Sequence, residues 1–290
     1  MYSFLYSFAV FLNTLRQSNM SDRSGILPNS PLLYTLASVR YATWSLLQNK
    51  IPEIHEHLRD ELPLLQRLQV RLMSQNMGIP LPEATSEVWL MMASDRTYAM
   101  QLGPDQALFF SSKYQRFADF QVRLERCLAA LFDHMKFMDV VATGVRYVDH
   151  IKPRTGERLE DYVIAGFLTP TVPSYRPVGG ASHFTYSTDH SELRVRSIFS
   201  TDYLSVPSDM VGLLAAVHAE PGKPLTLDSL QQNEMLLDMD SVKAYPQPQR
   251  VKELKEIMET FDNLHKSANA FFRHEAVCTD FAFNVWRGEE

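Results

Sequence analysis

The spacing of apolar residues predicts two long amphipathic helices. In two stretches, apolar side chains recur at three- and four-residue intervals, the repeat that places them on one face of an α-helix. These residues are Phe117, Phe120, Leu124, Leu128, Leu131, Phe132 and Met135 in the first stretch, and Val251, Leu254, Ile257, Met258, Phe261, Leu264, Ala268, Phe271 and Phe272 in the second. A shorter helix is predicted from Ile51 to Leu62, with Pro52 in its first turn and Pro63 at its end.

Stretches of alternating or β-branched and aromatic residues predict strands between these helices. Asn76 to Ser86 and the Pro-rich stretch Lys152 to Gly180 are expected to be irregular. Turn signals separate three consecutive strands before the first long helix, which predicts an antiparallel meander. The expected strands are Leu32–Trp44, Leu68–Leu72, Val88–Ala93, Thr97–Leu102, Ala107–Lys113, Val140–Ile151, Phe184–Ser187, Leu193–Phe199, Val211–Ala219, Met235–Val242 and a short one through Phe281, Phe283 and Val285.

Together these elements predict an α+β protein in which long amphipathic helices pack on antiparallel sheets. The tripeptide Val-Arg-Tyr occurs at Val39–Tyr41 and again at Val145–Tyr147, near the start of two similar series of strands and a long helix. One interpretation is an internal duplication with a central cleft between halves 29–138 and 139–290. The other is that Val and Tyr are simply common strand residues.

Residues 1–28 are expected to be an N-terminal extension, either disordered or appended to the fold. The apolar stretch Tyr2–Leu12 lacks a basic region before it and is too short to span a bilayer. Met20 is followed by Ser-Asp-Arg-Ser-Gly, which is typical of the start of a soluble protein. Our hypothesis is that residues 1–19 are an upstream extension that arises from an incorrect start site.

Composition and charge narrow the class of protein. The chain has 290 residues, of which 45% are hydrophobic and 21% charged, and its formal charge is −6. These values are typical of globular proteins, and the negative charge disfavours nucleic acid as a partner without excluding it. Cys127 and Cys278 are far apart in the sequence, so we expect neither a disulfide framework nor a zinc cluster, and we expect a cytoplasmic location. No membrane partner and no cofactor are expected.

The chain contains none of the common phosphate-binding, nucleophile or metalloprotease motifs. The densest polar cluster in an apolar strand contains Arg146, Tyr147, Asp149 and His150. Strand alternation places Arg146 on the same face as His150, and Tyr147 on the same face as Asp149. Arg146, Asp149 and His150 are therefore candidate residues for binding a ligand or partner. A buried Arg either forms a structural ion pair or contacts an anionic or planar group of a ligand.

Asp238 and Asp240 are a second candidate site. Residues two apart in a strand face the same side, so both carboxylates could contact one divalent cation. The alternative is that they are acids at the edge of a strand with no metal. His265 lies at the apolar edge of the last long helix, where we expect a hydrogen-bonded core residue.

The order of several short motifs resembles a sporadically distributed family of uncharacterised bacterial proteins of similar length. The likeness extends from about Asn29 to Trp286. The family implies no activity, but its patchy distribution implies horizontal transfer and favours a role in mobile elements, phage conflict or toxin–antitoxin systems. The motifs are Pro31-Leu32, the early Val-Arg-Tyr, Gly144–Val148, Leu237–Asp240, Leu264-His265, and Phe271-Phe272 before Thr279 and Trp286.

Three functions are compatible with these patterns. The first is a non-enzymatic binding or regulatory protein that recognises another macromolecule, expected to be a protein, with self-association into a homo-oligomer as a further option. The second is an enzyme that acts on a phosphate-containing substrate with a divalent metal at Asp238 and Asp240. The third is a sensor of a small ligand. The lack of a convergent catalytic set favours the first.

Overall fold

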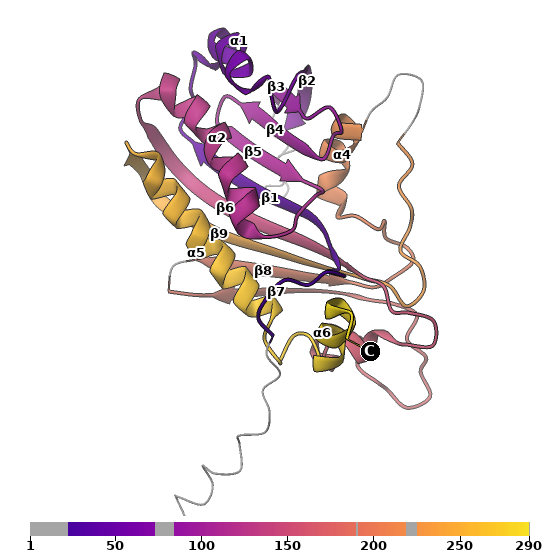
Figure 1. Cartoon of the computed structure of the whole chain (residues 1–290). Helices are drawn as coiled ribbons and strands as arrows, with labels where there is room; N and C mark the ends of the chain where they lie inside the picture. The colour runs from indigo at the N-terminus through magenta and orange to yellow at the C-terminus, as the bar shows by residue number, and fades with distance from the viewer. Residues whose placement is uncertain (1–22, 73–83, 190, 219–224, 290) are drawn as a thin grey trace, which may run out of the picture.

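The computed structural model describes residues 23–72, 84–189, 191–218 and 225–289 (Figure 1). They form one nine-stranded antiparallel sheet in the order β2-β3-β4-β5-β1-β6-β9-β8-β7. In chain order the strands are β1 (Leu32–Tyr41), β2 (Leu64–Leu72), β3 (Ala84–Met92), β4 (Tyr98–Gly103), β5 (Gln106–Ser111), β6 (Met138–Ile151), β7 (Ala181–Ser187), β8 (Glu192–Ile198) and β9 (Met235–Val251).

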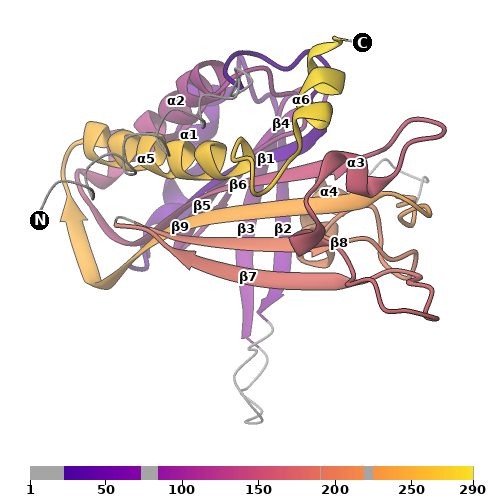
Figure 2. The ribbon, with the colours of Figure 1, turned by 90° about the horizontal axis from the view of Figure 1, so that it is seen from below.

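Helices cover both faces of the sheet. The two long helices α2 and α5 lie side by side on one face, together with α1 (Figure 2). The short helix α4 packs on the opposite face, against β3. The α-helices are α1 (Leu47–Leu58), α2 (Phe117–Met135), α3 (Leu159–Tyr162), α4 (Val211–His218), α5 (Leu254–Phe272) and α6 (Asp280–Arg287), and the 3-10 helices are η1 (Ala165–Phe167) and η2 (Ser208–Met210).

Each face of the sheet has its own hydrophobic core. The larger core packs the apolar stripes of α2 and α5, including Phe120 and Phe261, against alternate residues of the central strands such as Val39 and Val145. The smaller core contains Leu214 of α4 and strand residues such as Val148. Because side chains alternate along β6, Val145 and Tyr147 contribute to the first core and Val148 to the second. Burial of both faces explains why the central strands are so apolar.

The α+β class, the antiparallel sheet and the long helices on it are confirmed. The expected meander is present as β3, β4 and β5, which pair in sequence order. The apolar repeat marked α2 correctly from Phe117 to Met135, and it placed α5 within three residues of its observed start. Periodicity over five turns is a strong signal, and both stripes pack in the larger core.

Two predicted strands are wrong, because the structure has helices there. The stretch Val211–Ala219 forms helix α4, which ends at His218. A nearly continuous apolar run fits a buried strand and a buried helix equally well, so its pattern could not separate them.

The predicted strand through Phe281, Phe283 and Val285 is helix α6. Its first turn is capped by Thr279, whose hydroxyl accepts a hydrogen bond from the Ala282 backbone N–H at 3.1 Å. It ends at Gly288, which has a positive φ of 77°. These capping signals at both ends outweigh the alternation of the aromatic residues between them.

Several boundaries differ from the expectation. Helix α1 starts at Leu47, so Pro52 lies in its second turn instead of its first, and the helix ends at Leu58. Strand β1 ends at Tyr41 and not at Trp44. The irregular stretch 152–180 contains the short helices α3 and η1. Most of the expected loop Asn76–Ser86 lies outside the described residues, and β3 already begins at Ala84.

Strand β9 continues nine residues beyond its predicted end at Val242, and its last residue, Val251, pairs with Met138 of β6. Two prolines of this extension, Pro246 and Pro248, lie where the β6–β9 register shifts between Val140 and Ala142. Proline is tolerated at such an irregularity because no ladder hydrogen bond from its nitrogen is needed there.

The segments assigned to the two halves meet in the middle of the sheet, where β1 pairs with β6. The sheet is therefore continuous across the expected boundary between the two halves, which lies between residues 138 and 139. An internal duplication is not confirmed. Of the expected N-terminal extension, residues 1–22 lie outside the described part, and residues 23–28 contact α5 and the residues around α6. No helix among the described residues has the length and apolar character needed to cross a membrane.

Candidate functional site

Four charged residues form an ion-pair network on the face of the sheet that carries α4. Asp238 of β9 is 1% exposed. It accepts hydrogen bonds from Arg146 Nε at 2.8 Å and from Arg196 Nε at 2.7 Å. Asp209 of η2 accepts from Arg146 Nη1 at 2.7 Å and from Arg196 Nη2 at 3.1 Å. Burial alone would raise the pKa of Asp209, but its bonds to the two arginines lower it to about 2.

This network shows what Arg146 contacts within the chain. Its partners come from a neighbouring strand and from the segment that precedes α4, so the network ties α4 to the sheet. Asp240 lies opposite Arg146 in the β6–β9 ladder, on the same side as Asp238. Burial raises the pKa of Asp240, against the opposing charge of Arg146.

Asp238 belongs to the ion-pair network, and Asp240 lies two residues further along the same strand. Both oxygens of Asp238 accept hydrogen bonds from arginines. Within the described part of the chain, no group of three or more His, Cys, Asp and Glu side chains is arranged to hold a metal ion. Cations of the protein thus occupy the position that a metal ion would need.

His150 shares the face of Arg146 but has a different partner. Its Nε2 lies 3.0 Å from Glu234 Oε2. Burial and the charge of Lys152 hold the pKa of His150 below its ordinary value, although the bond to Glu234 acts in the opposite direction. Arg146 and His150 therefore have separate partners within the chain.

Asp149 points to the other face of the sheet and lines a large cavity. This cavity has a volume of about 760 Å³ and lies between the sheet, α5, the residues before α2 and the segment 24–28. Apolar side chains such as Phe117 and Phe272 form part of its walls, and several polar side chains form the rest. Its volume falls within the range of small-molecule pockets, which is roughly 300–1,000 Å³.

A hydrogen-bonded pair of side chains forms the wall between β6 and α5. The Tyr147 hydroxyl lies 2.7 Å from His265 Nδ1, and the His265 ring stacks on Phe117 with centroids 3.9 Å apart. Burial lowers the pKa of His265 to about 4, so the imidazole is neutral near pH 7. The hydroxyl and Nδ1 share one hydrogen bond, whose direction depends on the tautomer of the neutral ring.

Two arginines hold the segment that closes one side of the cavity. Arg273, at the end of α5, donates hydrogen bonds to the backbone oxygens of Arg23 and Gly25, the latter at 2.8 Å. Arg23 in turn donates to Asp280 Oδ1 through Nε at 3.0 Å and to the Cys278 carbonyl through Nη1 at 2.9 Å. Gly25 has a φ of 89°, which is favourable only for glycine and turns the segment along the cavity.

The carboxyl group of Asp149 has no side-chain partner among the described residues. The residue is 3% exposed, and no hydrogen bond or ion pair of its carboxyl group occurs in this part of the chain. Burial, with a smaller effect of the charge on Asp238, raises the pKa of Asp149 to about 8. A buried acid without a partner is costly when ionised, so this residue is the most unusual group of the cavity.

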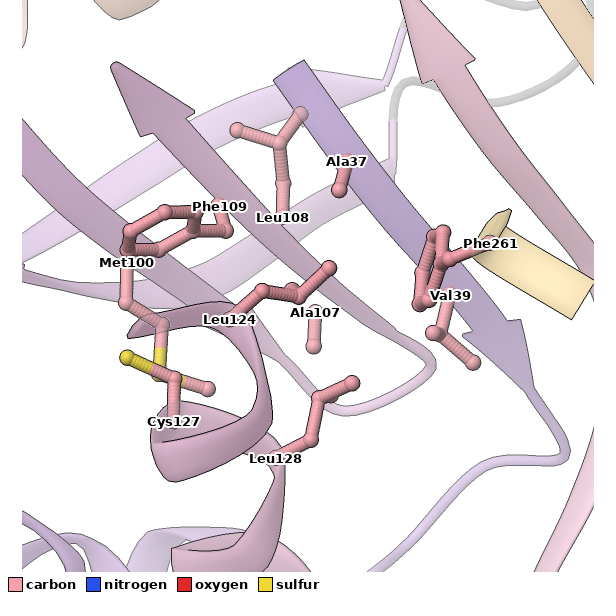
Figure 3. A pocket seen from close by; sticks show the side chains of 10 residues that line it. All are labelled: Ala37, Val39, Met100, Ala107, Leu108, Phe109, Leu124, Cys127, Leu128 and Phe261. Carbon is pink, nitrogen blue, oxygen red and sulfur yellow. The ribbon is translucent and has the colours of Figure 1, made fainter. Parts of the chain in front are cut away.

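A second cavity lies between α2 and the sheet, and it differs from the first in volume and in the polarity of its walls (Figure 3). Its volume is about 10 Å³, and all of its ten lining residues are apolar, among them Val39, Cys127 and Phe261. Burial raises the pKa of the Cys127 thiol to about 12. A space of about one water molecule with no polar partner stays dry, so this is a packing defect of the core.

Replacement of Asp149 by Asn is expected to change how stability depends on pH. Because the folded pKa of about 8 lies above the ordinary value, the folded chain binds the proton more tightly than the unfolded chain. Between these values, rising pH therefore lowers the free energy of unfolding, by at most about 1.4 kcal/mol per pH unit. Asp149→Asn removes this loss. Urea unfolding at about pH 6 and pH 8 measures it, and parallel pH dependence of the two proteins would contradict the assignment.

Comparison with known proteins assigns no family to the chain. No protein-family model matches the sequence, and no curated protein matches it. The fold and the site define it as an α+β protein with a ligand-sized cavity between its sheet and a long helix.

The three candidate residues of strand β6 are thus placed on two faces. Arg146 and His150 lie on the α4 face, and Asp149 lies on the cavity face beside Tyr147. Sequence reasoning missed Tyr114 and Arg273, which line the cavity. Tyr114 lies between β5 and α2 with no pattern to distinguish it. Arg273 follows the apolar stripe of α5 directly, a position that could have indicated a functional cation at a helix end.

Proposed function

We propose that this protein binds a small organic molecule in the cavity between the sheet and α5, and that it acts as a sensor of that molecule. The observation that carries this proposal is the carboxyl group of Asp149, which lies at the cavity wall and has no hydrogen bond or ion pair with the residues that the structure describes. Burying such a group without a partner costs free energy that an apolar residue in its place would avoid, so its presence calls for an explanation. A bound ligand that supplies the missing partner explains why it is there.

The remaining walls support a ligand with an apolar or aromatic body. Phe117 and Phe272 offer ring surfaces, and Leu27 and Met239 offer aliphatic contacts. The pair Tyr147 and His265 adds fixed polar groups. Such a combination of apolar walls and a few placed polar groups is typical of small-molecule sites.

The two other functions have less support from the geometry. An enzyme with a metal at Asp238 would have to displace Arg146 and Arg196 from that carboxylate. Recognition of another protein, including a role in phage conflict or a homo-oligomer, would leave the cavity unexplained. A protein partner fits the proposal as the receiver of the ligand signal.

The strand order supports the proposed internal duplication. In the first half, the opening strand β1 pairs with β5, the last strand before the long helix α2. In the second half, the opening strand β6 pairs with β9, the last strand before the long helix α5. The two opening strands, which carry the repeated Val-Arg-Tyr, pair with each other at the centre.

The state of the cysteines supports a cytoplasmic location, which we also propose. Cys127 and Cys278 are both free and buried. Burial raises the pKa of each thiol, so neither is activated for disulfide formation.

Native mass spectrometry of the protein purified from its own cells tests ligand binding. We expect a bound small molecule in addition to the mass of the chain. Ala268→Leu adds side-chain volume on the α5 wall of the cavity and is expected to reduce the bound fraction. Asp240→Asn is the control, because it changes a carboxyl group on the opposite face.

An unliganded chain would contradict the proposal if, in addition, no compound of a chemically mixed panel raised its melting temperature. Circular dichroism of Ala268→Leu must show the native fold for its loss of ligand to count.

A further inference from the structure

We infer that the ligand of this cavity carries a protonated amine and that Asp149 is the residue that binds it. The inference rests on the proposed function, since it names the chemical class of the ligand for the same cavity. It starts from the charges of the cavity walls.

Asp149 differs from the other unpartnered polar groups of the structure. Three hydroxyls of the described part of the chain, those of Thr35, Thr143 and Ser241, are fully buried without a hydrogen bond, and the Asp149 carboxyl group is not among such fully buried atoms. None of these three residues lines the large cavity, whereas Asp149 does. A neutral hydroxyl costs far less to bury than a carboxylate, so it does not call for a ligand.

The groups around Asp149 provide no cation for it within the described residues. Asp149 lies on the same side of β6 as Tyr147. Tyr114 and Cys278 are also close enough for the charge of Asp149 to raise their pKa values. Burial raises the pKa of all three of these groups, so they are uncharged near pH 7. Asp238 on the opposite face adds a negative charge and not a positive one.

The neighbouring basic residues are engaged elsewhere. His265 is neutral near pH 7 and shares a hydrogen bond with Tyr147. Arg273 donates to Asn269 Oδ1 at 2.9 Å and to the Gly25 carbonyl. Arg23 forms an ion pair with Asp280, and Arg116 forms one with Asp119.

An ammonium group fits this environment better than a neutral or anionic group does. It offers N–H donors and a positive charge to a carboxylate that lacks both, and such charge-assisted hydrogen bonds are strong. The ring of Tyr114, which lines the cavity near this carboxyl group, can also contact the cation. Ionising Asp149 for this purpose costs only about tenfold in affinity at pH 7, because its pKa is about 8. An anionic ligand would instead meet a second acid.

Isothermal titration of the full chain with three matched compounds tests the inference. The compounds are 2-phenylethylamine, 3-phenylpropionate and 2-phenylethanol, which share an aromatic body and differ in the polar end. We expect the amine to bind at least about tenfold more tightly than the other two, the ratio that corresponds to one charge-assisted contact. Asp149→Asn should remove this preference, and Asp240→Asn and Asp139→Asn should retain it.

Proton release gives a second, independent readout. Near pH 7 the free protein carries the Asp149 proton and the amine is already charged, so binding should release about one proton per amine. Titration in buffers of different ionisation enthalpy measures this number. Asp149→Asn should bind without proton release.

The outcomes separate this inference from the proposed function. If phenylpropionate or phenylethanol binds more tightly than the amine, and Asp149→Asn does not change this, the inference of an amine ligand is wrong. The cavity then remains a ligand site for another class of compound. If none of the three binds, the molecule found by native mass spectrometry decides, because the inference requires a basic nitrogen in its composition. An empty cavity in that measurement, with no stabilising compound in the panel, overturns both.

Discussion

Asp238→Asn is expected to lower the free energy of unfolding by about 3–5 kcal/mol, because it removes the central anion of a buried ion-pair network. Asp238 is 1% exposed and binds both Arg146 and Arg196. In the variant, Arg146 is left with Asp209, whose side chain is 52% exposed. The amide cannot neutralise two guanidinium groups, so part of their positive charge remains buried without compensation.

Asp139→Asn is the matched control for this experiment. Asp139 accepts two hydrogen bonds from Arg250, at 2.8 and 3.0 Å, at the other end of the same pair of strands. The Arg250 side chain is 57% exposed, so we expect a loss below about 1 kcal/mol. Urea unfolding of both variants measures the two values. Equal small losses would show that the Asp238 network is not a stabilising element.

Phe261→Ala is expected to cost about 3–5 kcal/mol of stability. Phe261 lies on α5, is fully buried and already borders the small apolar cavity near Val39 and Leu128 (Figure 3). Truncation removes apolar contacts and enlarges that cavity, and rigid strands on the other side cannot collapse into it.

Phe120→Ala on α2 should behave in the same way, since Phe120 is 3% exposed. Val122→Ala is the control on the same helix, because Val122 is 67% exposed and its truncation should change stability by about 0.5 kcal/mol or less. Thermal melts of the three variants compare them. Phe261→Ala or Phe120→Ala with the wild-type melting temperature would contradict the packing described here.

The parts of the fold that the sequence predicted are those with a long, regular apolar repeat. Helices α2 and α5 each repeat their stripe over 19 residues, and turn residues separate the strands of the meander. Helices α4 and α6 have only eight residues each. In such short elements, helix and strand patterns overlap, and capping residues such as Thr279 carry the distinguishing information.

The candidate site could be predicted only where it depends on one strand. Alternation along β6 correctly separated Arg146 and His150 from Tyr147 and Asp149. The cavity depends on segments far apart in the sequence, from Gly25 to Arg273, and no local pattern reports their meeting. The same holds for Asp209, whose place beside Arg146 results from the path of the chain before α4.

The segment that closes the cavity bears on how fast a ligand can enter and leave. Residues 24–28 are not part of the sheet, and their contacts include hydrogen bonds from Arg273 and Arg287 and the packing of Leu27 on the core. Releasing them breaks these contacts and leaves the strand ladder intact, so the free energy of this local opening is a fraction of that of global unfolding. If the cavity binds the proposed ligand, its exchange with solvent would therefore need only this local opening and not global unfolding.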